Sequence, residues 1–265
     1  MNERISIQIS GGVADVRLNR PDKMNALDPA MFEALINAGA TLRTTKGIRA
    51  VVLSGEGRAF CAGLDMASFA SLGTSDVLGQ DLMTRTFGTS NAFQHVCMLW
   101  RELPMPVIAA VHGVAFGGGL QVALGADMRF VAPDARMSVM EIKWGLVPDM
   151  GGMVLMRELA RADVLRELTF TGRQFSGDEA LRLGFATQLH SDPHGAAMAA
   201  AAGMAQSSPA ALRAAKRLFN GAADQDAGAL LLAESHEQDL LIGSPSQMEA
   251  VMANMEKRPP RFLDE

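Results

Sequence analysis

Residues 107–124 of the chain read VIAAVHGVAFGGGLQVAL and join a strand signal, a glycine run and a helix signal without any Asp, Glu, Lys or Arg. The apolar stretch 107–111 predicts a buried strand, and the apolar residues that follow Gly119 predict a buried helix to about residue 124. Glycines that lead into a helix leave backbone N–H groups open, and the positive end of the helix favours negative charge. A phosphate, a carboxylate or a transient oxyanion would fit there. On the glycines alone, close packing of the helix explains the run at least as well.

The same region must be weighed as a membrane span, because residues 103–126 contain no Asp, Glu, Lys or Arg and are long enough to cross a bilayer. Pro104, Pro106 and the glycine run would break a continuous helix, and Gln121 would carry a polar group into lipid. A buried strand, a loop and a buried helix start fit better. We expect no membrane partner.

Strand and helix signals alternate on both sides of this region. Strands over 4–10 and 13–18 are joined by Gly11-Gly12, which is a hairpin turn signal, and Asp28-Pro29 is an N-cap signal for a helix over 29–44. The other predicted elements are a strand over 50–54, a helix around 81–103, the strand 107–111, a helix over 117–124, and strands over 128–131 and 136–139. This alternation indicates an α/β domain with right-handed crossovers.

Beyond about residue 177 the pattern changes. The elements predicted there are helices only, over residues 177–183, 196–207, 209–219, 227–242 and 245–255. We therefore divide the chain into an α/β core over residues 1–190 and a helical C-terminal region over residues 191–265.

Composition narrows the class of protein. The chain has 265 residues, of which 48% are hydrophobic and 20% charged, and a formal net charge of −5, which describes a globular protein with a full core. This charge provides no basic surface for nucleic acid or an anionic membrane. Two cysteines, Cys61 and Cys97, cannot form a disulfide framework. With 18 methionines and no apolar leader in MNERISIQIS, the sequence favours a cytoplasmic location.

Two more segments are candidates for a functional site, one because it follows a buried strand and the other because it places a charged residue in an apolar run. RAFCAGLD, residues 58–65, comes directly after the strand 50–54, and MSVMEIKWGLVPDMGG, residues 137–152, contains Glu141 among apolar side chains. A carboxyl group in such surroundings has a raised pKa, as a general acid or base near neutrality must have. A Glu141 paired with Lys143 or Arg136 is an equally good interpretation at this point.

Other sites are disfavoured. The glycine run matches neither G-x-x-x-x-G-K-[ST] nor G-x-G-x-x-G followed by an acid. His112 ends a buried strand and is interpreted as structural, and Cys61 as a small side chain that lines a pocket and lacks a basic partner. The remaining histidines show no metal-ligand spacing with each other or with a cysteine, so no metal is predicted. They are His95, His190, His194 and His236.

The three segments together resemble the enoyl-CoA hydratase/isomerase, or crotonase, superfamily. Each motif is weak alone, but their order and spacing along the whole chain are highly specific. The matching motifs are Arg20-Pro21, Asn25-Ala26-Leu27, Ala59 to Asp65, Gly117-Gly118-Gly119, Pro148 with Gly151-Gly152, Thr171-Gly172-Arg173, Ser176 with Glu179-Ala180, and Glu256-Lys257-Arg258.

The resemblance implies a crotonase-like spiral of ββα units with two nearly perpendicular sheets. The active site would lie in this core, and the helical C-terminal region would build a homotrimer or a dimer of trimers and complete the acyl-CoA pocket. By position, the backbone N–H groups of Ala62 and Gly118 would form an oxyanion hole for the carbonyl of a thioester. Such donors stabilise the enolate that forms when a proton leaves the neighbouring carbon.

The same resemblance implies where coenzyme A binds. The loop with Gly63, Asp65 and Met66 would hold the adenine end, and Lys23 and Arg58 are candidates for the phosphates. Lys257 matches a family lysine that reaches the CoA of a neighbouring subunit, although Asn254 stands where an aromatic residue is common. Coenzyme A would be part of the acyl-CoA substrate, and no separate cofactor is expected.

The reaction depends on which acids are present. Family hydratases use two glutamates; Glu141 matches one of them, but Gln121 stands at the other position, and an amide cannot accept a proton from water at neutral pH. Asp149 matches a second acid of dienoyl-CoA isomerases, or else it caps a helix over 150–159. We favour double-bond isomerisation of enoyl-CoA with Glu141 as the base. Hydration of enoyl-CoA, and a catalytically weak acyl-CoA-binding scaffold, are the alternatives.

Overall fold

The computed structural model describes residues 4–69 and 82–263. A six-stranded sheet has the order β1-β2-β3-β4-β6-β9, and a three-stranded sheet has the order β5-β7-β8. The strands of the larger sheet are β1 (Ile5–Ser10), β2 (Val13–Leu18), β3 (Ala50–Gly55), β4 (Val107–Val111), β6 (Met128–Val131) and β9 (Gln188–Leu189). Those of the smaller sheet are β5 (Val114–Phe116), β7 (Arg136–Ser138) and β8 (Phe175–Ser176).

The larger sheet has the expected mixture of one hairpin and parallel crossovers. β1 and β2 pair antiparallel around Gly11-Gly12, with Ser10 opposite Val13, which confirms the predicted hairpin. β2, β3, β4, β6 and β9 are parallel to one another, so each needs a crossover connection. The α/β class and the alternation predicted for residues 4–131 are therefore confirmed.

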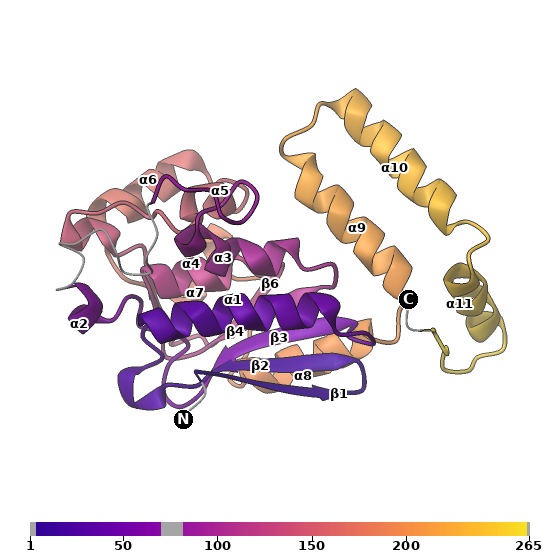
Figure 1. Ribbon diagram of the computed structural model, residues 1–265, viewed down its shortest axis with the longest axis horizontal. Coiled ribbons are helices and arrows are strands. Elements are labelled where there is room, and N and C mark those ends of the chain that lie inside the picture. Colours follow the sequence, from indigo (N-terminus) through magenta and orange to yellow (C-terminus); the bar gives the residue numbers. More distant parts are fainter. Residues whose placement is uncertain (1–3, 70–81, 264–265) are drawn as a thin grey trace.

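The central strands β3 and β4 are buried on both faces, and their successive side chains point to opposite sides of the sheet. In β4, Val107, Ala109 and Val111 belong to the main core, whereas Ile108 and Ala110 belong to a second, smaller core. Two helices, α1 (Pro29–Thr44) and α3 (Ala92–Glu102), contribute to the main core (Figure 1). The second core is closed by α8 (Pro193–Met204), whose alanines pack on β3 and β4.

Several short elements lie between the strands along the chain. They are the 3₁₀ helices η1 (Pro21–Lys23) and η2 (Glu141–Trp144), with α2 (Met66–Phe69), α4 (Gly118–Leu124), α5 (Gly152–Met156), α6 (Ala162–Thr171) and α7 (Gly177–Leu183). The smaller sheet places η2 beside α4, because Gly117 N–H donates to the carbonyl of Ser138 in β7 at 3.0 Å. Two segments separated by about 20 residues are thereby joined.

The last three helices extend away from the sheet. They are α9 (Pro209–Ala222), α10 (Ala227–Leu241) and α11 (Pro245–Met255), and Figure 1 shows them as an arm beside the core. The chain returns to the core at Phe262, whose carbonyl accepts a hydrogen bond from Arg49 at 2.9 Å. Many of the arm's apolar side chains are exposed, namely Phe219, Leu231, Leu232, Leu240, Met248, Val251, Met252 and Met255.

Some predicted boundaries were wrong. The helix expected from residue 81 begins at Ala92, where Asn91 and Gln94 form a capping box; residue 81 itself lies outside the described residues. The stretch beyond residue 177 is not purely helical, because β9 adds a two-residue strand to the larger sheet at Gln188–Leu189. The sequence reading also missed β5, whose three residues are too few to show a periodic pattern.

Within the described residues, no helix has the length and apolar character needed to span a membrane. The apolar stretch 103–126 instead forms β4, β5 and α4, as a buried strand followed by a turn and a helix.

Candidate active site

The glycine run turns the chain sharply from β5 into α4. Gly117 has φ 50° and ψ −122°, a conformation that side chains disfavour, and a Cβ there would lie 3.4 Å from Oε1 of Glu141. Gly119 packs against Cys61 so closely that a Cβ would lie 2.8 Å from its sulfur. Within this run, the sharp turn therefore depends on Gly117 and the close packing on Gly119.

The amides near the expected oxyanion hole are used differently from the sequence prediction. Ala62 N–H donates to the carbonyl of Met24 at 2.9 Å, so it is not free for a thioester oxygen unless this bond opens. Leu27 forms a parallel β-bridge with Leu64. The N–H of Leu27 donates to the carbonyl of Gly63, and the carbonyl of Leu27 accepts from the N–H of Asp65. The N–H of Leu64 therefore points away from Leu27, and no described residue accepts it.

Gly118 lies beside this bridge. As the first residue of α4 it has an N–H without a partner inside the helix, and a Cβ placed on Gly63 would lie 3.8 Å from the Gly118 nitrogen. Met150 and Leu27 cover the other side of Gly118, where a Cβ would lie 2.8 Å from the sulfur of Met150. The geometry thus favours Leu64, which the sequence reading missed, over Ala62 as the second donor beside Gly118.

Glu141 begins η2 and is 9% exposed. Its Oε1 accepts a hydrogen bond from Nε2 of Gln121 at 2.6 Å, while its Oε2 is buried and has no hydrogen-bond partner. Burial raises the pKa of Glu141, the negative charge of Asp149 raises it further, and the hydrogen bond from Gln121 lowers it. A carboxyl group with a raised pKa and one unengaged oxygen is suited to moving a proton.

The structural alternative for Glu141 is not seen. Among the described residues it forms no ion pair with Lys143 or Arg136: its Oε1 is bound by Gln121 and its Oε2 has no hydrogen-bond partner. Lys143 lies over the ring of Trp144 and Arg136 over the ring of Phe116.

Asp149 lies on the turn between η2 and α5. The N-cap of α5 is Gly151, with φ 86° and no side-chain cap bond, so the alternative in which Asp149 caps this helix is wrong. The helix itself spans only Gly152–Met156. The side chain of Asp149 is open to solvent on one side, and the surrounding protein still desolvates it enough to raise its pKa. The next residue, Met150, donates its N–H to Gln121, which in turn donates to Glu141, so the segments that carry the two carboxyl groups lie in one region.

The residues expected to bind coenzyme A fall into two groups. Lys23 and Arg58 are exposed on two turns. These turns are neighbours, because a Cβ on Gly57 would touch Pro21. Asp65 is instead bound within the protein: Oδ2 accepts from Arg20 at 2.6 Å and Oδ1 accepts from the N–H of Ala67 at 2.8 Å.

Gly63 and Met66 flank this aspartate. Gly63 is buried with φ 90° and adjoins Phe116, whereas Met66 at the start of α2 is exposed. Met66 is therefore more accessible to a ligand than the carboxylate of Asp65.

Lys257 lies far from these groups in the same chain. It follows α11 in the left-handed conformation, with φ 53°, and Figure 1 shows α11 and α2 on opposite sides of the molecule. Lys257 therefore lies away from the residues of its own chain that are expected to bind coenzyme A.

The thiol and imidazole groups near the site have structural contacts. Cys61 is buried and donates to the carbonyl of Asn25, and burial raises its pKa to about 12, so it stays protonated. His112 bonds to the carbonyl of Gly57 at 2.9 Å, the kind of structural role predicted for it. Within the described part of the chain, no group of three His, Cys, Asp or Glu side chains is placed to hold a metal ion.

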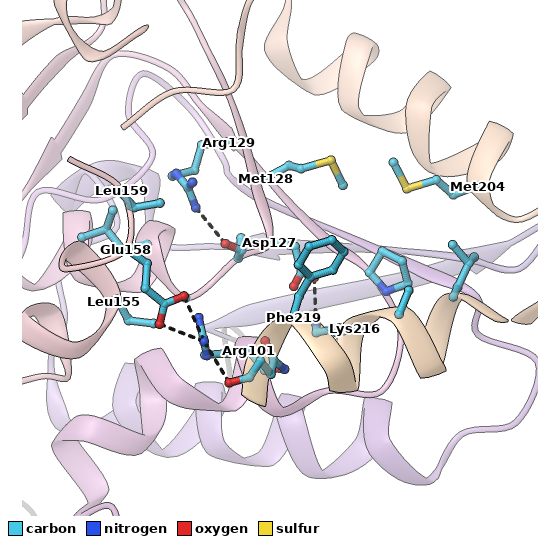
Figure 2. A pocket seen from close by; sticks show the side chains of 17 residues that line it. Arg101, Asp127, Met128, Arg129, Leu155, Glu158, Leu159, Met204, Lys216 and Phe219 are labelled. Carbon is cyan, nitrogen blue, oxygen red and sulfur yellow. Dashed lines mark hydrogen bonds and ion pairs between the residues drawn. The ribbon is translucent and has the colours of Figure 1, made fainter. Parts of the chain in front are cut away.

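A cavity of about 530 Å³ lies elsewhere, between α9 and the core (Figure 2). Lys216 of α9 is buried against it and donates to Trp100 O, Met105 O and Asp127 Oδ2 at 2.8–3.0 Å, which uses all three of its N–H groups. None of the site residues predicted from the sequence lines this cavity. We interpret the Lys216 contacts as the anchor of α9 to the core.

Comparisons with known proteins show the family of the chain. The family described as Enoyl-CoA hydratase/isomerase matches residues 8–265. A protein from Mycobacterium bovis named "Probable enoyl-CoA hydratase echA6" is 33% identical over 97% of this chain and 98% of its own. The mitochondrial Delta(3,5)-Delta(2,4)-dienoyl-CoA isomerase of Rattus norvegicus is 33% identical over 80% of this chain and 67% of its own.

The fold is shared as well. The crystal structure of an enoyl-CoA hydratase from Bacillus anthracis superposes with a TM-score of 0.89 at 28% identity, covering 98% of both chains. The shared fold thus defines a crotonase-type protein. The chain belongs to the enoyl-CoA hydratase/isomerase family.

Proposed function

We propose that the protein isomerises the double bond of an enoyl-CoA thioester through an enolate, with Glu141 as the base. The observation that carries this proposal is the state of Glu141, which is buried, has a raised pKa and keeps Oε2 without a partner. A scaffold that only binds acyl-CoA has no use for such a carboxyl group, because burying it without a full set of hydrogen bonds costs stability.

The chemistry uses few groups. The thioester oxygen accepts hydrogen bonds from the N–H groups of Gly118 and Leu64, and Oε2 of Glu141 takes a proton from C2 of a 3-enoyl-CoA. The electron pair of the broken C–H bond delocalises into the thioester as an enolate. The proton then returns to C4 from Glu141, or an equivalent proton comes from Asp149, and the double bond forms between C2 and C3. One well-aimed donor to the developing charge is worth about 3–4 kcal/mol in comparable sites.

Hydration of a 2-enoyl-CoA is the second candidate, and the relative named as a hydratase favours it. Against it stands Gln121, which replaces the second carboxylate that two-glutamate hydration uses. The relative named as a dienoyl-CoA isomerase favours the first candidate, together with Asp149 beside Glu141.

Substrate binding and assembly complete the proposal. Lys23, Arg58, Met66 and the backbone at Gly63 would receive the nucleotide end of coenzyme A. The exposed apolar side chains of the arm formed by α9–α11 would pack against other copies in a homotrimer or a dimer of trimers. In such an assembly Lys257 would reach the CoA of a neighbouring copy.

The decisive experiment compares Glu141→Gln with wild type on 3-enoyl-CoA, 3,5-dienoyl-CoA and 2-enoyl-CoA. We expect loss of double-bond migration by a factor of about 10³ or more with acyl-CoA affinity retained, because general base catalysis contributes on that scale. The exposed Glu33→Gln in α1 is the matched control and should change nothing. Unchanged migration by Glu141→Gln would refute the assigned base. Efficient conversion of 2-enoyl-CoA to the hydroxyacyl-CoA by wild type, without migration, would establish hydration instead.

A further inference from the structure

The side chain of Gln121 makes three hydrogen bonds in a fully enclosed position. Gln121 is 2% exposed in the middle of α4. Its Nε2 donates to Oε1 of Glu141 at 2.6 Å, and its Oε1 accepts from the N–H groups of Met150 and Gly152, both at 2.9 Å. The partners determine the amide orientation: the flipped form would direct two N–H groups at backbone N–H groups and one oxygen at a carboxylate oxygen.

These contacts leave Gln121 no capacity to accept a hydrogen bond from a substrate water. An amide oxygen has two lone pairs, and both are taken by backbone N–H groups. The approach of Gly152 depends on its lack of a side chain, because a Cβ there would lie 2.6 Å from Oε1 of Gln121. Gln121 is thus built into the wall of the site.

The two oxygens of Glu141 become inequivalent as a result. Oε1 is engaged by Gln121, whereas Oε2 is buried and unpartnered. On the other side of the amide, the turn that follows Asp149 is tied to the same side chain through Met150 and Gly152. One residue therefore connects both carboxyl-bearing segments to α4.

We propose that Gln121 is a positioning residue which leaves Oε2 of Glu141 as the single oxygen that moves the proton and fixes the Asp149 turn beside it. This inference rests on the proposed isomerisation. It also gives a reason for an amide at position 121: with Gln121 in α4 and Glu141 in η2, only one carboxylate at this contact can take part in the reaction.

A glutamate at position 121 would act differently on its two sides. Its carboxylate could still accept from Met150 and Gly152, so the turn and the fold would be kept. Toward Glu141, however, an oxygen would face an oxygen at hydrogen-bond distance, and the two groups would have to share a proton. In a plot of kcat against pH, the fall of kcat on the acid side (the acid limb) would then occur at higher pH.

The test measures kcat and KM for 3-enoyl-CoA against pH in wild type, Gln121→Glu and Gln121→Met, with Gln188→Glu on exposed β9 as the control for added charge. For Gln121→Glu we expect kcat to fall about 10-fold or more, KM to change by less than about 3-fold, and the acid limb to rise by about one pH unit or more. Gln121→Met loses the hydrogen bond that Gln121 donates to Glu141. This variant should also shift the acid limb to higher pH and lower kcat. Gln188→Glu should leave the profile in place.

The outcomes separate this inference from the proposed function. If wild type neither isomerises 3-enoyl-CoA nor exchanges the C2 hydrogens of a bound acyl-CoA for deuterium, the proposed function fails. If wild type does so but Gln121→Glu keeps the wild-type acid limb and kcat, the positioning role is overturned. A lowered melting temperature with an unmoved pH profile would likewise show that Gln121 is only structural. Because Gln121→Glu preserves both backbone contacts, it decides the question even if Gln121→Met does not fold.

Discussion

The backbone N–H of Ala62 donates to the carbonyl of Met24 at 2.9 Å, whereas the N–H of Leu64, two residues later, points away from Leu27 and is accepted by no described residue. Both residues lie in the segment that the sequence assigned to the oxyanion hole. Gly63, between them, has φ 90°, so the segment is not extended there and the two N–H groups do not share the side that residues two apart in a strand would share.

The first prediction concerns these two amides. Replacing Leu64 by its α-hydroxy acid changes the N–H to an ester oxygen and keeps the side chain. We expect kcat for 3-enoyl-CoA to fall by about 10²–10³, the usual effect of removing an oxyanion donor. The same change at Ala62 should lower kcat less than about 10-fold and cost about 1 kcal/mol of unfolding free energy, because it removes the bond to Met24. A larger kcat loss at Ala62 than at Leu64 would show that the Met24 bond opens in the working enzyme.

The second prediction concerns pH. Burial raises the pKa of Glu141 above its ordinary value of 4.5, so kcat/KM should fall with acid at a pH above that of an ordinary glutamate. The effect on stability has the opposite direction to that of a salt-bridged acid. Between the unfolded and the folded pKa the native state binds more protons, so unfolding free energy falls as pH rises through this window and is constant above it.

The variant Glu141→Gln removes this titration. Relative to wild type it should be more stable at pH 8, and the difference should disappear below about pH 4, where the carboxyl group is protonated in both states. Urea unfolding of the two proteins across this range measures the difference. An equal difference at both ends of the range would mean that ionisation of Glu141 is not its cause.

The third prediction compares two glycines. A Cβ on Gly119 would lie 2.4 Å from the carbonyl oxygen of Cys61, and the backbone on both sides is fixed, so Gly119→Ala should cost about 1–3 kcal/mol or more of stability. Gly203, in α8, has nothing within 4 Å of such a Cβ, so Gly203→Ala should stabilise the protein by about 0.4–1 kcal/mol through helix propensity and the unfolded state. Thermal unfolding of both variants measures the contrast, and a tolerated Gly119→Ala would mean that α4 can shift from Cys61.

Sequence signals predicted those elements whose causes are local. The helix Pro29–Thr44 has its Asp28 cap and the strand Val107–Val111 is apolar on both faces, and both were predicted with the bounds they have in the structure. Strands of two or three residues, such as β8 and β9, show no period and exist only through their partners. The capping box of Asn91 and Gln94 was present in the sequence and would have set the start of α3.

The site was predictable as a set of residues but less so in its roles. Glu141 and Gln121 could be named from their motifs, yet the direction of the Gln121 amide depends on Met150 and Gly152, which the fold brings to it. The choice between Ala62 and Leu64 likewise depends on which carbonyl the chain meets across the bridge. Motif spacing carries no information about either contact.

The last prediction concerns Lys257. This residue follows α11 in the left-handed conformation that glycine adopts most easily, and the N–H of Arg258 returns to the carbonyl of Ala253 at 3.0 Å, as in a helix end that favours glycine. Lys257→Gly should therefore raise the unfolding free energy by about 1 kcal/mol. If Lys257 binds the phosphates of CoA on a neighbouring copy, the same variant should raise KM for the acyl-CoA while leaving KM for the corresponding acyl-pantetheine unchanged. Lys257→Ala, which loses the charge but keeps the strain, should reproduce the effect on KM without the gain in stability. An unchanged KM for acyl-CoA in both variants would remove Lys257 from the binding site and leave it as the end of a helix.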